Sequence, residues 1–397
     1  MKDSGLLKLD HELKHCKEVL NELNPHIRDK QNSGEHKKRN GKLQKVLIAN
    51  RGEIAKRFFL SLHEEGITST AVVTDPDKGQ SWYDFADEVV FIGGHNNYSD
   101  PCTIIAAVQI TGANAIYSGY GFLSENYSFV KIIDRLNSTA DSKIIFMGPS
   151  YDTMHLMGDK ISARRIASEN SIPLFESSGI FRTSEIEPVK NEAGRIGYPF
   201  ILKLTAGGGG KGMVQVFSGD YLEAAVDTCT RTGLALYNNA AFYIERLIQK
   251  PVHIEVQIFN GSVIGIRKCA VQRRNQKIIE ESGEIFIDEE TYDSMISIAE
   301  KIAGLSGYGN NSGAGTIEFL IDKDTGKFGF LEMNTRLQVE YAVTDQSFDI
   351  DLVKAQIRLF DGRENLFQHL HSPERRKGSR NHAIECRIYA EDTDNGY

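Results

Sequence analysis

The sequence predicts a mixed fold, in which a parallel α/β domain comes first and an α+β region rich in antiparallel strands follows. Between residues 45 and 150, short apolar runs alternate with helical patterns, which is typical of a parallel sheet covered by helices. Between residues 241 and 282, strand patterns follow one another directly, and Asn260-Gly261 forms a strong hairpin signal between two of them. Residues 313 to 341 indicate a further pair of strands joined by a tight Asp-Thr-Gly turn.

The first residues predict an amphipathic helix over positions 6 to 23. Asn24-Pro25 ends it, and residues 31 to 42 form a polar stretch without periodicity that indicates a linker. The apolar stripe of this helix requires a cover, which is either its own domain or a partner subunit. The stripe consists of residues spaced by three and four, namely Leu6, Leu9, Leu13, Cys16, Leu20 and Leu23.

The α/β region supplies the expected first sheet. A ligand crevice in such a sheet lies at the carboxyl ends of the strands, where residues 50–52 and 119–121 fall. The predicted strands cover residues 45–50, 69–74, 87–93, 114–118 and 144–148, and the predicted helices cover about 53–65 and 103–111.

A glycine-rich segment follows two short helices predicted over residues 151 to 175, with Lys160 between them. The strand over 198–205 carries Lys203 inside an apolar run, where a lysine must extend to solvent or meet an anion. The AGGGGKG loop then opens a strand rather than a helix and lacks GK[ST], so it is neither a dinucleotide fingerprint nor a P-loop. Its backbone N–H groups, with Lys203 and Lys211, can fold over phosphates, and a bare flexible turn is the alternative.

Two glutamates face each other in the predicted hairpin of residues 313–341. Glu318 and Glu332 are equally distant from Thr325 in the turn, so their Cβ atoms should lie roughly 5 Å apart on one face. Two such carboxylates require a proton or a cation between them, and Mg²⁺ suits hard oxygen ligands. A solvated strand face is the alternative interpretation. The period of two extends the same polar row through Asn334, Arg336, Gln338 and Glu340.

Composition limits the classes of function. With 397 residues the chain should form two or three domains, and its net charge of -8 offers no global field for binding nucleic acid. The five cysteines form no CxxC pair, which argues against a zinc site or a disulfide framework and fits a reducing cytoplasm. No apolar run is long enough for a membrane span, and no signal peptide is evident, so we expect a soluble cytoplasmic protein.

Nine motifs in a fixed order resemble the biotin carboxylase component of biotin-dependent carboxylases, which is an ATP-grasp enzyme. They are ANRGEIA, GYGFLSEN, MGDK, GYPFILK, AGGGGKGM, QRRNQK, GAGTIEFL, EMNTRLQVE and HAIECRI, and the match runs from about residue 45 to 392. After the helix and linker at 1–42, the resemblance implies an N-terminal α/β (pre-ATP-grasp) domain at 43–150 and an ATP-grasp domain at 151–361. Residues 362–397 would begin a C-terminal subdomain that is incomplete in this chain.

The resemblance also assigns roles to individual residues. Lys160, Lys203, Gly209 and Gly210 would hold the ATP phosphates, Glu245, Leu247 and His253 would surround adenine and ribose, and Gln272 and Asn275 would complete the nucleotide site. Glu318, Glu332 and Asn334 would hold Mg²⁺ or Mn²⁺, and Lys277, Arg336, Gln338 and Val339 would bind bicarbonate. Glu340 would be the general base, and Arg387 would stabilise the biotin enolate.

The implied activity is ATP-dependent carboxylation of biotin with bicarbonate, through carboxyphosphate, within an acyl-CoA-type carboxylase. Biotin would be a carrier-bound substrate, so the implied partners are a biotin carboxyl carrier protein, carboxyltransferase subunits and a second copy in a homodimer. Asn275 replaces a family histidine and Tyr341 replaces another, and these departures support an alternative: a non-catalytic relative that binds nucleotide or a partner.

Overall fold

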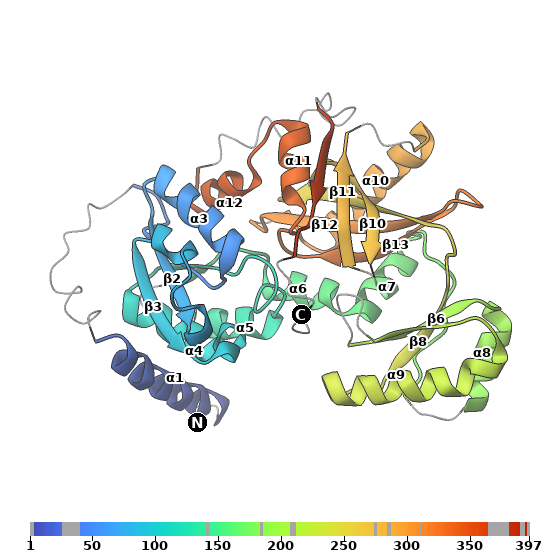
Figure 1. Cartoon of the computed structure of the whole chain (residues 1–397), viewed down its shortest axis with the longest axis horizontal. Helices are drawn as coiled ribbons and strands as arrows, with labels where there is room; N and C mark the ends of the chain where they lie inside the picture. Colours follow the sequence, from blue (N-terminus) through green and yellow to red (C-terminus); the bar gives the residue numbers. More distant parts are fainter. Residues whose placement is uncertain are drawn as a thin grey trace.

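The computed structural model describes residues 4–25, 40–139, 143–182, 186–206, 212–273, 276–283, 287–309, 311–363, 381–389 and 394 (Figure 1). Four residues of the predicted site, Gly209, Gly210, Lys211 and Asn275, lie outside these described residues. No helix in the described part of the chain is both long and apolar enough to cross a membrane.

A five-stranded parallel sheet forms the first half of the molecule, in the order β3-β2-β1-β4-β5, as the alternating pattern predicted. Helix α3 packs on one face through Phe58 and Phe59, and α4 packs on the other through Ile104 and Ile105. The elements are β1 (Lys45–Ile48), α3 (Gly52–Glu64), β2 (Thr68–Thr74), β3 (Glu88–Gly93), α4 (Pro101–Thr111), β4 (Ala115–Tyr117), α5 (Tyr127–Asn137) and β5 (Ile145–Phe146).

Helix α1 (Ser4–Leu23) packs on this domain, which is the first of the two covers expected for its stripe. Leu9, Leu13 and Leu20 are buried in one cluster with α4, beneath which α1 lies in Figure 1. Asn24 then fixes the end of the helix, because its amide donates to Phe91 O and accepts from Phe91 N, both at 2.8 Å. The buried leucines of α1 are therefore part of the first core.

The crevice expected beside β1 and β4 is closed by a side chain. Asn50 Nδ2 donates to Ser118 O at 2.7 Å and to Tyr120 O at 2.8 Å, so the amide bridges the two strand ends. A Cβ on Gly119 would lie 2.8 Å from that amide nitrogen, which leaves no room for a side chain there. Further along the chain, Glu125 and Tyr127 line the large cavity that is described in the next section.

The second half contains two antiparallel sheets. A three-stranded sheet, β7-β6-β8, carries α8 and α9, and a six-stranded sheet has the order β13-β12-β9-β10-β11-β14 (Figure 1). The small-sheet elements are β6 (Phe200–Leu204), β7 (Met213–Val216), β8 (Phe242–Arg246), α8 (Ile186–Ile196) and α9 (Leu222–Tyr237). The large-sheet strands are β9 (Pro251–Phe259), β10 (Ser262–Arg273), β11 (Gln276–Ser282), β12 (Ala314–Asp322), β13 (Phe328–Asn334) and β14 (Ala383–Cys386).

Helices join these sheets to each other and to the first domain. The predicted pair over 151–175 is present, with Lys160 as the first residue of the second helix. Helix α12 packs on α3, so the apolar core of the first domain continues into the end of the second half. The helices are α6 (Tyr151–Gly158), α7 (Lys160–Glu169), α10 (Glu289–Leu305), α11 (Tyr341–Phe348) and α12 (Leu352–Phe360).

The expectation of one strand from the turn to residue 341 is wrong. Strand β13 ends at Asn334, and Tyr341 begins helix α11. Leu337 leaves the sheet to join the core of the first domain, while Arg336 turns toward Glu125, with Nε 3.0 Å from Glu125 Oε2. The polar alternation over 334–340 therefore belongs to a loop that connects the two halves.

Candidate active site

A cavity of about 1050 Å³ lies between the small sheet and the large sheet. Residues from α6, α7 and all strands of the two sheets except β14 line it, together with Arg387, which directly follows β14. Every predicted site residue in the described part of the chain lies on its wall: Lys160, Lys203, Glu245, Leu247, His253, Gln272, Lys277, Glu318, Glu332, Asn334, Arg336, Gln338, Val339, Glu340 and Arg387.

The two glutamates of the hairpin are opposed, as the distance from the turn predicted. Glu318 on β12 pairs with Glu332 on β13 in the antiparallel register. Glu318 is 3% exposed, whereas the Glu332 side chain is 36% exposed toward the cavity. Burial and the repulsion of Glu318 raise the pKa of Glu332, and among the described residues its nearest ion-pair partner is Lys160, with Nζ at 3.9 Å.

Glu318 is held by donors on both of its oxygens. Oε1 accepts from Asn334 and Gln338 at 2.7 Å each, and Oε2 lies 2.7 Å from His253 Nε2. Burial alone would raise the pKa of Glu318, but attraction to Lys277 and His253 outweighs it and lowers that pKa well below its usual range. Glu318 is thus an ionised carboxylate in a preorganised position.

Lys277 is the cation around which the buried carboxylates gather. Its Nζ lies 2.8 Å from Glu318 Oε1 and 2.9 Å from Glu340 Oε1, and it also forms an ion pair with Glu255. Burial would lower the pKa of Lys277, but these three carboxylates raise it well above its usual value. Lys277 therefore enters this buried network, whereas Arg273, at the end of β10, stays exposed.

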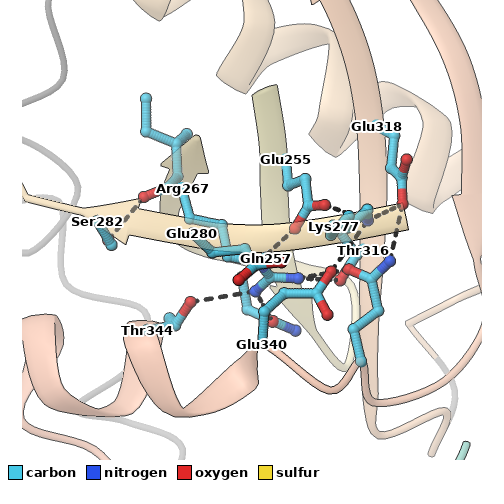
Figure 2. A network of polar contacts seen from close by, with 12 residues as sticks. Glu255, Gln257, Arg267, Lys277, Glu280, Ser282, Thr316, Glu318, Glu340 and Thr344 are labelled. Atoms are coloured by element: carbon cyan, nitrogen blue, oxygen red, sulfur yellow. Dashed lines mark hydrogen bonds and ion pairs between the residues drawn. The ribbon is translucent and has the colours of Figure 1, made fainter. Parts of the chain in front are cut away.

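A buried arginine that the sequence interpretation missed supports the same network (Figure 2). Arg267 on β10 is fully buried and forms an ion pair with Glu255, its partner in the register of β9 and β10. Its two Nη atoms donate to Gln257 at 2.6 Å and to Thr316 at 3.0 Å. Nη1 also donates to Thr344 at 3.2 Å, and Nη2 also donates to Gln338 at 2.5 Å. These five donor contacts fix the floor of the site, since a buried charge is tolerated only when it is fully paired.

A second ion-paired group lies on the small sheet. Lys203 on β6 forms an ion pair with Glu245 on β8, which answers the requirement that this lysine meet an anion. Arg164 Nη1 of α7 also donates to Glu245, at 2.5 Å, and its Nη2 donates to Ser177 at 2.9 Å. Burial would raise the pKa of Glu245, but Lys203 and Arg164 lower it. Sequence patterns gave no signal for Arg164.

The alternation of polar and apolar residues in β9 is a sequence signal that could have predicted the polar floor of the site. His253, Glu255 and Gln257 alternate with apolar residues in HIEVQIF, and the register places Glu255 opposite Glu318. His253 Nδ1 lies 2.8 Å from Gln272 Nε2 on β10. Burial lowers the pKa of His253, but the attraction of Glu318 outweighs it and raises that pKa to about 10.

The donor set fits a hard divalent cation at the hairpin. Glu318, Glu332 and Asn334 offer three oxygen donors beside an open cavity, and Glu332 accepts no side-chain hydrogen bond within the described residues. Such oxygen donors are the ligands that Mg²⁺ and Mn²⁺ take. His253, Glu255 and Glu318 also bring ligand atoms within 4.8 Å of one another. Lys277 pairs with two of these three, so its ammonium group already supplies positive charge there.

Family comparisons agree with this arrangement. Residues 42–154 match the model "Biotin carboxylase, N-terminal domain", and residues 159–366 match "Carbamoyl-phosphate synthase L chain, ATP binding domain". A biotin carboxylase of a Nostoc species is 41% identical over 367 residues, which cover 90% of this chain and 78% of that protein.

Solved structures give the same result. A biotin carboxylase from Campylobacter jejuni, described as a β,γ-ATP complex, has a TM-score of 0.79 and 40% identity, covering 88% of this chain and 77% of that one. The biotin carboxylase domain of Hydrogenobacter thermophilus 2-oxoglutarate carboxylase, a dimer with MgADP, ADP and bicarbonate, has a TM-score of 0.79 and 34% identity. It covers 89% of this chain and 76% of that one.

The fold and the cavity define an ATP-grasp ligase, with the predicted α/β domain before it. Within that class the chain belongs to the biotin carboxylase family. The predicted family, the fold class and ATP-dependent carboxylation of biotin as the family's reaction are thereby confirmed.

Proposed function

We propose that this chain uses ATP and bicarbonate to carboxylate biotin in the cavity between its two antiparallel sheets. The observation that supports this most strongly is the convergence of fifteen predicted site residues from separate motifs on one cavity wall. Opposed carboxylates, three lysines and three arginines in one cleft supply the charges that phosphoryl transfer to an anion requires.

The nucleotide would lie between the small sheet and the hairpin. Lys160 and Lys203 would hold its phosphates, and Leu247 and His253 would lie beside adenine and ribose, which is supported by the presence of all four residues on the wall of one cavity. ATP would also draw Lys203 away from Glu245, because a triphosphate carries more charge than one carboxylate. Glu318, Glu332 and Asn334 would hold Mg²⁺ or Mn²⁺, which when bound neutralises charge on the phosphates.

Bicarbonate would bind beside Lys277, Arg336, Gln338 and Val339, which are close together on the wall. Glu340 would take its proton, and the bicarbonate oxygen would attack the γ-phosphorus as ADP leaves. The carboxyphosphate formed would split into CO₂ and phosphate. That phosphate would take the N1′ proton of biotin, and the resulting enolate, paired with Arg387, would bond to CO₂.

Carrier-bound biotin implies further chains. We include in the proposal a biotin carboxyl carrier protein, carboxyltransferase subunits of an acyl-CoA-type carboxylase, and a homodimer. The Hydrogenobacter thermophilus domain, described as a dimer with bicarbonate, supports the last point and the choice of anion. A reducing cytoplasm is the proposed compartment, supported by cysteines at five positions that are all unpaired as disulfides.

The proposal is tested by phosphate release from ATP with the purified chain. We expect hydrolysis that depends on bicarbonate and rises further with free biotin. Hydrolysis without that dependence would contradict the proposal. Mg-ATP binding without turnover would instead favour the non-catalytic alternative suggested by Asn275 and Tyr341.

A further inference from the structure

Arg387 lies between two buried carboxylates. Its Nη2 is 2.6 Å from Glu340 Oε2 and 3.3 Å from Glu280 Oε1, so one nitrogen faces both. Glu280 is on β11 and is fully buried, and the network of Figure 2 places it with Glu255, Arg267 and Glu340. No role has been given to Glu280 so far.

Three polar atoms of Glu280 and Arg387 have no hydrogen-bond partner among the described residues. Neither oxygen of Glu280 accepts a hydrogen bond from a described residue, and Nε of Arg387 donates none to one. Buried carboxylates and guanidinium groups are expected to find partners. A small rotation of the guanidinium would satisfy all of these atoms together, because Nε and Nη2 form a fork that matches a carboxylate.

The observed contact also suppresses the proposed base. Glu340 Oε1 accepts a hydrogen bond from Lys277, and Glu340 Oε2 accepts one from Arg387. Burial would raise the pKa of Glu340, but Lys277, Arg267 and Arg387 outweigh it and lower that pKa to about 2. A base is most effective when its pKa is near the working pH. Glu340 therefore needs to lose a cationic partner before it can take a proton from bicarbonate.

We propose that Glu280 is a positioning residue that competes with Glu340 for the guanidinium of Arg387. When Glu280 holds Arg387, Oε2 of Glu340 is released to accept the bicarbonate proton, and Arg387 is fixed by a bidentate contact where it can face the enolate. When Glu340 holds Arg387, as here, the base is blocked. This inference rests on the proposed function of Glu340 and Arg387.

The charges around Glu280 make this competition depend on pH. Arg387 and Lys277 attract its ionised form, while Glu340, Glu255 and Glu385, which is its register partner on β14, repel it. Burial is the largest influence and raises the pKa of Glu280 to about 7. Below that pH the group is neutral and Arg387 stays on Glu340, and above it the charged group draws Arg387 away. Activity should therefore rise as pH rises through about 7.

Biotin carboxylation by the full chain, measured from pH 6 to 9 at saturating Mg-ATP and bicarbonate, tests this. We expect the wild-type rate to rise about tenfold between pH 6 and 8, following the ionised fraction of a group with a pKa near 7. Glu280→Gln should give a flat profile relative to wild type, with about a tenfold lower rate at pH 8. Its Mg-ATP affinity should not change, since Glu280 forms no hydrogen bond or ion pair with the described residues proposed to hold ATP.

Two matched variants distinguish positioning from a general structural role. Glu281→Gln changes the next residue, whose partner is Lys268 at 2.8 Å, and should follow the wild-type profile. Glu385→Gln removes a like charge opposite Glu280, so the rise should persist but move to lower pH. If Glu280→Gln does not fold, Glu280→Asp keeps the charge and should keep the rise.

Different outcomes would contradict the role of Glu280 and the proposed biotin carboxylation. A normal pH rise in Glu280→Gln, an equal loss in Glu281→Gln, or a flat profile in Glu280→Asp would overturn the role of Glu280. A wild-type chain that carboxylates no biotin at any pH would overturn the proposed function itself, and the inference with it.

Discussion

Glu318 and Glu332 lie opposite each other on β12 and β13, but the surrounding side chains satisfy only one of them. Glu318 is held by Lys277, His253 and two amides, whereas in the described part of the chain the ion-pair partner of Glu332 is Lys160 at 3.9 Å. The pair is therefore asymmetric, with one carboxylate fixed by the protein and the other presented to the cavity. This is the arrangement expected of a cation site that opens toward a phosphate ligand.

Glu332→Gln should abolish stabilisation by Mg-ATP without harming the protein alone. The substitution removes the repulsion between two carboxylates, so the unliganded melting temperature should stay the same or rise. A ligand at 100 times its Kd stabilises a protein by about 2.7 kcal/mol, and most of this should be lost. Thermal shift with and without Mg-ATP measures both quantities. Glu169→Gln, an exposed change at the end of α7, is the control.

A large loss of stability in unliganded Glu332→Gln would show that the carboxylate makes a structural contact. Mg-ATP stabilisation equal to wild type would remove it from the cation site.

Arg267→Ala should destabilise the protein strongly, because it leaves Glu255 buried with one cation fewer. Breaking a buried ion pair by removing one partner costs about 3 to 5 kcal/mol. Denaturant unfolding gives the value. Lys268→Ala is the adjacent control, and its partly exposed pair with Glu281 should contribute less than about 1 kcal/mol. Similar small losses in both variants would contradict the structural role of Arg267.

His253 should make stability depend on pH on the alkaline side. Its pKa is raised to about 10 in the folded state, so the ion pair with Glu318 contributes fully below the unfolded value of about 6.5. That contribution is lost as pH rises toward 10, at about 1.4 kcal/mol per pH unit. The unfolding free energies of wild type and His253→Gln should therefore converge between pH 6.5 and 10. Parallel curves would show that His253 is neutral in the folded protein.

Leu20→Ala should destabilise the first domain, since Leu20 is 1% exposed in the core that α1 shares with α4. Truncating a buried leucine costs about 2 to 5 kcal/mol. Val19→Ala, at a position 41% exposed on the same helix, should cost much less. The free energies of unfolding of the isolated chain show whether α1 is stabilised by its own domain or needs a partner subunit. Equal, small effects would mean that α1 contributes little until a partner subunit binds.

Local patterns predicted the parallel sheet and the opposed glutamates because both depend on short-range signals. Strand and helix periods are visible over a few residues, and the distance of Glu318 and Glu332 from one turn fixes their register. Helices α8 and α9 were not predicted from the sequence.

The parts that could not be predicted depend on contacts between distant segments. Arg336 follows a strand-like alternation, but β13 ends at Asn334, and the partner of Arg336 is Glu125 in the other half of the chain. Arg267 and Arg164 are buried cations whose partners come from other elements, so nothing near them in the sequence marks their role. The position of Glu280 beside Arg387 likewise arises only when β11 meets β14.

The most direct measurement of the central claim follows labelled carbon from bicarbonate into biotin. Purified chain is incubated with labelled bicarbonate, free biotin and Mg-ATP, with Glu340→Gln and Glu281→Gln in parallel. The account predicts carboxybiotin that requires ATP in the wild type and in Glu281→Gln, and a loss of at least about a hundredfold in Glu340→Gln, since general base catalysis contributes about 10² to 10⁴. Label incorporated equally by Glu340→Gln, or none incorporated by the wild type, would contradict it.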